Sequence, residues 1–257
     1  MKVVAEMRVL VSDCLTGTSL DVMAVAPHPD DAELGVGGIL ALAGDKGLSA
    51  GILDLTAGEM STNGTPEERL EESIQAAELL TLSWRANLGL PDGGITDSEE
   101  QVRSLAQVLR HLKPKLLLLP HRRDRHPDHA RSADLGERAA FAAGLKQSDL
   151  SGSPHTVGLV AYYCINEFLE PDLVVDVSVV HRKKRQALSA HASQFDPRGR
   201  RETVLNHPSF LRMIYSRDGM LGSAKGVAFA EGLSLREPPL VRDLGFLTRT
   251  APERKGD

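Results

Sequence analysis

The chain has 257 residues, of which 41% are hydrophobic and 25% charged, as in an ordinary globular protein long enough to bury a sizeable core. A net charge of −5 gives no basic field for nucleic acid, and no apolar run approaches the ~20 residues that a membrane span needs. The two cysteines, Cys14 and Cys164, are too few for a disulfide framework and indicate reduced thiols in a cytoplasmic protein.

Residues 1–20 form an N-terminal extension. The sequence allows three interpretations of it: a short extra strand, a loosely attached segment, or the product of an upstream start codon. Charged residues interrupt its apolar stretch at Glu6, Arg8 and Asp13, which argues against a signal peptide. Residues 21–247 are predicted to form a single domain, because no linker, repeat or low-complexity block divides them. The polar residues 248–257 are predicted to be a frayed tail.

Strand-like and helical segments alternate along this domain. Helix starts are marked by Thr65, Pro66 and Glu68, which are an N-cap, a proline at the first helical position and a capping-box glutamate, and by Ser98. Such alternation is typical of an α/β protein with a Rossmann-like, mainly parallel sheet and helices on both faces. We expect strands at 21–26, 51–58, 86–91, 115–120, 157–165 and 172–178, and helices at 32–47, 65–80, 98–113, 130–144 and 179–195.

Two clusters of histidine and aspartate each follow a predicted strand. Residues 28–31 read His-Pro-Asp-Asp after the strand at 21–26, and residues 126–129 read His-Pro-Asp-His soon after the strand at 115–120. Either cluster alone is more often a turn near a helix start. Because ligands bind at the carboxyl ends of strands in open α/β sheets, we expect the two clusters to converge on one site.

A catalytic zinc ion needs three protein ligands and one open position, and two groups from the first cluster with one from the second would supply a His₂Asp set. Bound zinc would lower the pKa of water towards ~7. Asp30 is placed to accept a proton, His126 to donate one, and Asp128 to hold an imidazole in one tautomer. A two-histidine, one-carboxylate set also suits iron(II), so zinc is favoured and iron stays an alternative.

A dinucleotide site is the competing interpretation of the first cluster. A strand, a glycine-rich turn, a helix and then Asp54 imitate the G-x-G-x-x-G fingerprint, and Gly35 and Gly37 match its first two glycines. The third position is Leu40, however, and the acidic pair before the helix would repel a pyrophosphate. The sequence therefore disfavours a nucleotide.

The motif PHPDDAE at 27–33 and the motif HPDH at 126–129 resemble the two signature motifs of the LmbE/PIG-L-like N-acetylglucosamine (GlcNAc) deacetylases, with proline replacing the usual alanine before His28. Between residues 21 and 235, segments such as LPDGGI, DRHPDH, INEFLEPDLVVDVS and GVAFAEGL resemble the branch that serves bacillithiol biosynthesis. The resemblance implies an LmbE-like fold and zinc-dependent removal of acetate from N-acetyl-D-glucosaminyl L-malate. Another GlcNAc or thiol conjugate, or a non-catalytic metal- or sugar-binding protein, are the alternatives.

The same resemblance implies roles for individual residues. It makes Asp30 the general base and His126 the acid or oxyanion stabiliser, oriented by Asp128. It also implies that Arg69 contacts the substrate, although a surface arginine paired with Glu72 is the simpler interpretation of that residue. The expected ligands of one Zn²⁺ per chain are His28, Asp31 and His129.

Other features of the resemblance are less specific. It favours a homo-oligomer and a small-molecule GlcNAc conjugate as the partner. The tyrosine that assists the oxyanion in many relatives is replaced by Leu221 at the aligned position. The nearby Tyr215 has two possible roles, assisting the oxyanion or packing in the core. Glu33 would either support the metal ligands or favour the start of a helix. Asn166 would either donate a hydrogen bond to the substrate or stabilise a turn.

Overall fold

The computed structural model describes residues 2–3 and 19–241 and has an eight-stranded sheet at its centre. The strand order is β1-β4-β3-β2-β5-β6-β8-β7, and every pair is parallel except those that β8 makes with β6 and β7. The predicted, mainly parallel sheet is therefore confirmed. The strands are β1 (Lys2–Val3), β2 (Val22–Ala26), β3 (Ala50–Asp54), β4 (Trp84–Asn87), β5 (Leu116–Pro120), β6 (Leu159–Tyr163), β7 (Leu173–Asp176) and β8 (Ala230–Leu235).

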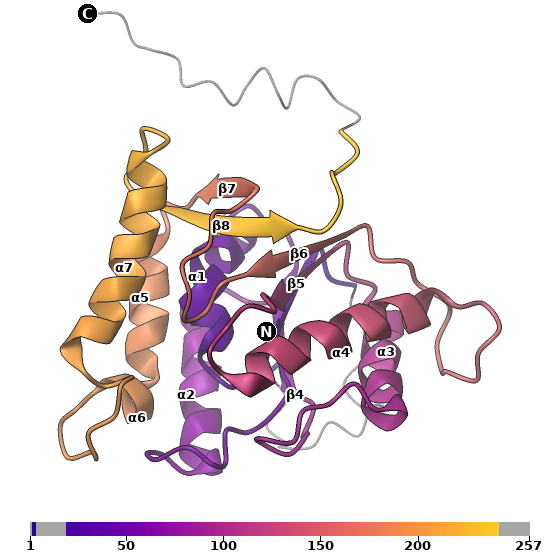
Figure 1. Cartoon of the computed structure of the whole chain (residues 1–257), viewed down its shortest axis with the longest axis horizontal. Coiled ribbons are helices and arrows are strands. Elements are labelled where there is room, and N and C mark those ends of the chain that lie inside the picture. Colours follow the sequence, from indigo (N-terminus) through magenta and orange to yellow (C-terminus); the bar gives the residue numbers. More distant parts are fainter. Residues whose placement is uncertain (1, 4–18, 242–257) are drawn as a thin grey trace, which may run out of the picture.

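Helices cover both faces of the sheet, as predicted (Figure 1). One apolar core lies between the sheet and α1, α2, α5 and α7, and a second lies between the sheet and α3 and α4. No helix in the described ranges is long and apolar enough to cross a membrane. The helices are α1 (Asp31–Asp45), α2 (Pro66–Leu79), α3 (Glu99–Leu112), α4 (Pro127–Gly144), α5 (His181–Ala190), α6 (Ala192–Phe195) and α7 (Pro208–Ser223).

The direction in which strands are added reverses at β2. From β2 the chain adds β3 and then β4 on one side, and it returns to place β5 and β6 on the other side. Ligands of open α/β sheets bind at such a switch point, where the carboxyl ends of the two central strands diverge. This topology brings the residues that follow β2 and β5 to one place.

Several element boundaries differ from the sequence-based expectation. The strand expected at 86–91 begins at Trp84 and ends at Asn87, while α7 and β8 have no counterpart among the predicted elements. Lys2 and Val3 pair with β4, so the extension contributes an edge strand. Residues 4–18, the predicted domain end at 247 and the predicted tail at 248–257 lie outside the described residues.

Capping side chains begin the helices that position the site. Thr65 accepts from the backbone N–H of Glu68, and Ser98 caps α3, as predicted. The fourth helix begins at Pro127 instead of residue 130, because His126 acts as its N-cap and proline suits the first helical position. The second His-Asp cluster is thus itself the first turn of α4.

A buried ion cluster joins α5, α7 and β8 to α1. The Lys184 ammonium group, which is fully buried, donates to Asp218 and Glu231, both at 2.7 Å. The Glu231 carboxylate also accepts from the backbone N–H groups of Gly38 and Ile39 at 2.8 and 2.7 Å, just after a kink in α1. Four elements that are distant in sequence are therefore held through one lysine.

Replacing Lys184 with methionine should lower the free energy of unfolding by about 3–5 kcal/mol, because two buried carboxylates would lose their cation. The neighbouring Lys183 pairs with Asp45 near the surface, so Lys183→Met should cost less than about 1 kcal/mol. Urea unfolding of the two variants measures the difference. Equal stabilities would contradict the proposed importance of the buried cluster.

Candidate metal centre and active site

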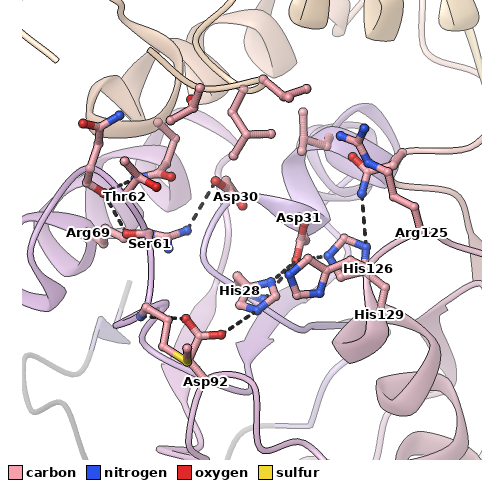
Figure 2. A pocket seen from close by; sticks show the side chains of 18 residues that line it. His28, Asp30, Asp31, Ser61, Thr62, Arg69, Asp92, Arg125, His126 and His129 are labelled. Carbon is pink, nitrogen blue, oxygen red and sulfur yellow. Dashed lines mark hydrogen bonds and ion pairs between the residues drawn. The ribbon is translucent and has the colours of Figure 1, made fainter. Parts of the chain in front are cut away.

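A pocket of about 310 Å³ opens where β2 and β5 end. It is lined by every predicted site residue except Asp128 (Figure 2), whose carboxylate lies 3.5 Å from Nε2 of His28. The two His-Asp clusters, about a hundred residues apart in sequence, therefore meet in one cavity, as expected. The predicted residues in its lining are His28, Asp30, Asp31, Arg69, His126 and His129.

The Asp31 carboxylate lies between the imidazoles of His28 and His129. One of its oxygens is 3.0 Å from Nδ1 of His28 and 3.3 Å from Nε2 of His129. Ring nitrogens of His28, His126 and His129 also lie within 4.8 Å of one another. Beside His28 and His129, the geometry therefore offers two candidates for the third metal ligand, Asp31 and His126. The assignment of Asp31 to this role stays a prediction.

Further carboxylates surround the histidine rings. Nε2 of His28 is 3.1 Å from Asp92 and 3.5 Å from Asp128, and Nδ1 of His129 is 3.0 Å from Asp124. Carboxylates behind ligand histidines fix ring orientation and raise ligand basicity.

These carboxylates also determine the charge that the pocket favours. Burial alone would lower the pKa of His129, but Asp31 and Asp124 outweigh it and raise that pKa to about 9. The pKa of His28 is likewise held well above its usual range by Asp128, Asp31 and Asp92, against the effect of burial. The cluster therefore favours positive charge at its centre, and its nitrogen and carboxylate donors fit a divalent cation.

Asp30 is the N-cap residue of α1 and has a backbone φ of 122°, in the region that favours glycine. A non-glycine residue held in such a sparsely populated region costs about 1–3 kcal/mol, and such residues concentrate at functional sites. The carboxylate is buried, and burial raises its pKa to about 7 although the nearby Arg69 lowers it. A carboxylate with a pKa near neutrality suits a general base, the role predicted for Asp30.

Arg69 is buried on α2 and faces the first cluster. Its guanidinium donates to the carbonyl oxygens of Pro29 and Gly58 at 2.6 and 3.1 Å, and it lies 3.3 Å from Asp30. The alternative of a surface pair with Glu72 is wrong, because only 3% of Arg69 is exposed. Its contacts position Asp30, and contact with the substrate stays a prediction.

Replacing Arg69 with glutamine should lower the free energy of unfolding by roughly 3 kcal/mol, because a buried carboxylate and two carbonyl oxygens would lose their donor. Arg103 pairs with Asp149 at the surface, so Arg103→Gln is a matched control and should cost less than about 1 kcal/mol. Urea unfolding at neutral pH measures both. A loss at Arg69 no larger than that at Arg103 would contradict the positioning role.

The structure changes the expected link between His126 and Asp128. His126 is an exposed residue, and its Nδ1 accepts from the backbone N–H of Asp128 at 3.3 Å, so the neutral ring carries its proton on Nε2. The Asp128 carboxylate instead accepts from the backbone N–H of Gly93 at 2.8 Å and faces His28. Asp128 therefore orients His126 through its backbone, while its side chain supports His28.

Two further carboxylates of the site, Asp92 and Asp124, escaped the sequence-based assignment. Asp92 follows β4 and Asp124 follows β5, so each stands beyond the carboxyl end of a parallel strand, and this was the signal that could have identified them. Asn166, for which two roles were open, donates to Asp124 at 3.0 Å and lies 3.5 Å from His129. It therefore helps to hold the Asp124–His129 pair.

No tyrosine lines the pocket, and all three tyrosines lie within the described residues. Tyr162 donates to Glu137, and Tyr163 donates to a backbone oxygen of β2. The ring of Tyr215 packs under the guanidinium of Arg185 at 4.8 Å, which supports the packing interpretation of this residue. Leu221 is not in the lining either.

The groups of the dinucleotide fingerprint serve packing. A Cβ atom on Gly35 would lie 2.1 Å from the Tyr163 ring, so this glycine lets α1 approach β6 closely. Asp54, the candidate ribose ligand, is buried and accepts two hydrogen bonds from Arg85, at 2.8 and 3.0 Å. Neither residue is available to a nucleotide.

Comparison with known proteins agrees with this geometry. Residues 23–140 match the family described as PIG-L, GlcNAc-PI de-N-acetylase. The chain is 30% identical over 233 residues to diacetylchitobiose deacetylase of Thermococcus kodakarensis, covering 85% of this chain and 86% of that protein. It is 29% identical over 187 residues to a probable N-acetyl-alpha-D-glucosaminyl L-malate deacetylase 2 of Bacillus subtilis, covering 67% of this chain and 82% of that protein.

A solved structure supports the same assignment at the level of the fold. The crystal structure of the conserved protein TT1542 from Thermus thermophilus aligns with a TM-score of 0.80 and 41% sequence identity. The alignment covers 86% of this chain and 97% of that protein. Together with the pocket described above, these similarities show that the chain belongs to the PIG-L/LmbE family and is a hydrolytic deacetylase.

Proposed function

We propose that this deacetylase hydrolyses the N-acetyl group of N-acetyl-D-glucosaminyl L-malate, giving glucosaminyl malate and acetate in bacillithiol biosynthesis. The observation that carries the reaction type is the Asp31 carboxylate between two imidazoles, with Asp30 beside it in one pocket. The aglycone is supported by the Bacillus subtilis relative and by Arg125, an exposed cation in the pocket lining that suits a malate carboxylate.

We further propose that His28, Asp31 and His129 hold one Zn²⁺, with iron(II) as the alternative that the same donors allow. When bound, such a cation acts as a Lewis acid that polarises the acetyl carbonyl and acidifies water.

The chain's own groups then move the protons. Asp30 accepts a proton from the water that attacks the acetyl carbon, and Arg69 keeps its carboxylate in place. The Nε2–H group of His126 donates a hydrogen bond to the developing oxyanion. For the C–N bond to break, His126 takes up a proton from solvent and passes it to the departing amine, while Asp30 returns the proton of the attacking water to solvent, and acetate is released.

A second candidate substrate is diacetylchitobiose, because the Thermococcus relative is similar over more of this chain than the Bacillus relative. Acetate release from the malate conjugate, diacetylchitobiose, free GlcNAc and an acetylated thiol conjugate, measured on metal-analysed protein, decides between them. We expect the highest kcat/KM with the malate conjugate. A malate conjugate no better than free GlcNAc would refute the assignment, and no turnover of any substrate would favour a binding protein.

A further inference from the structure

We propose that a groove beside the catalytic pocket binds the aglycone, and that it gives the enzyme a further activity on GlcNAc glycosides with an alkyl or aryl aglycone. This rests on the proposed deacetylation of GlcNAc conjugates, but not on malate as the aglycone. The groove has a volume of about 730 Å³, within the range of small-molecule sites.

The groove adjoins the catalytic pocket. Four residues line both cavities, so a ligand with its acetyl group at the His-Asp cluster can extend across these residues into the groove. Arg125 comes from the loop before α4, Asn166 from the segment after β6, and the other two precede α7. The shared residues are Arg125, Asn166, Thr203 and Val204.

Part of the groove lining is apolar and faces water. Val204 is 60% exposed and Met213, on α7, is 45% exposed. Beside them Phe210 is buried and stacks on Phe195 with a centroid distance of 6.1 Å. This side of the groove therefore packs directly on the apolar core. The remaining lining is polar, as in sites that bind small molecules of mixed polarity. These polar residues are Arg125, Asn166, Glu202, Thr203, His207 and Ser209.

Malate suits Arg125, which lines both cavities, but it does not match the apolar part of the groove. Malate carries two carboxylates and almost no apolar surface, so it would gain nothing from Val204 or Met213 and would meet Glu202 at like charge. An alkyl or aryl group would instead cover both apolar side chains and release the water on them. The groove therefore favours an aglycone that continues past the polar junction at Arg125 as an apolar group.

Acetate release from methyl and hexyl glycosides of GlcNAc, of the same anomeric configuration, tests the groove. A fully buried methylene strengthens binding about four-fold, so partial burial of the five added methylenes should lower KM by at least about ten-fold. In Met213→Glu a carboxylate would enter the groove, and the preference for hexyl over methyl should fall to about one. Met220 lies on the same helix and is 51% exposed, but it lines neither cavity, so Met220→Glu should keep the preference.

Each outcome has one meaning. Equal KM values for methyl and hexyl glycosides in the unchanged enzyme would overturn the groove proposal, and so would a hexyl preference that survives in Met213→Glu. No acetate from either glycoside would also overturn the groove proposal, and the malate conjugate assayed beside them shows separately whether the proposed deacetylation of GlcNAc conjugates holds. A hexyl preference that disappears in Met213→Glu and persists in Met220→Glu supports the groove.

Discussion

Asp30→Asn is expected to lower kcat/KM for the deacetylation by about 10²–10⁴-fold, the usual contribution of a positioned general base, while the protein keeps its bound metal. Asparagine has the same size and still offers an oxygen to Arg69, but it cannot accept a proton from water. Steady-state kinetics of acetate release, combined with metal analysis of the same sample, measures both effects.

An exposed aspartate provides the control for this substitution. Asp97 pairs with Arg138 at the surface, away from the pocket, so Asp97→Asn should change neither kcat/KM nor metal content. Full activity in Asp30→Asn would show that another group accepts the proton. Loss of metal in this variant would instead make Asp30 a ligand.

His28→Ala is expected to remove both the metal and the activity, because one ring contacts the Asp31 carboxylate and two further carboxylates that hold it in place. Loss of a carboxylate that merely supports a ligand already costs about 10–100-fold in metal affinity, and loss of the ligand should cost more. Metal titration of the apoprotein and acetate release measure the two losses. His111→Ala, whose ring contacts a backbone oxygen on α3, is the control.

The third ligand can be identified in the same experiment. If Asp31 completes the set, Asp31→Ala should lose metal, whereas His126→Ala should keep metal and lose turnover. The opposite result would assign the ligand role to His126, whose ring centroid lies 4.9 Å from that of His28. Full metal content in His28→Ala would exclude every ligand set considered.

The location of the site followed from the sequence because strand position is a local property. Short apolar runs predict buried strands, and a polar cluster directly after such a run must lie at a carboxyl end of the sheet. Two such clusters were enough to predict the pocket around His28 and His129. Their adjacency depends on β2 and β5 being neighbours, which the topology confirms.

The C-terminal part of the fold could not be predicted, because only some of its buried positions are apolar. Helix α7 buries Phe210, Ile214, Asp218 and Gly222, so half of its core-facing positions carry a charge or no side chain. Strand β8 buries Glu231 against Lys184. Hydrophobic periodicity does not detect a helix or strand whose buried face is completed by ion pairs.

Local sequence patterns also fail to identify the residues around the His-Asp cluster. Arg69 has the local signature of an exposed helical arginine, and only tertiary packing places it beside Asp30. Asp92 contacts His28 although the two residues are 64 positions apart in sequence, and no local sequence pattern around Asp92 predicts this contact. Long-range pairs of this kind require the fold before they can be recognised.

The backbone angle at Asp30 gives a substitution there two opposing effects on stability. A φ of 122° with a ψ of −26° favours glycine, so Asp30→Gly would relieve about 1–3 kcal/mol of strain. The same change would leave the buried Arg69 guanidinium without its carboxylate partner, which costs about 3–5 kcal/mol. Selection of variants for survival at high temperature alone should therefore retain Asp30, so a laboratory evolution scheme for heat tolerance does not discard the general base.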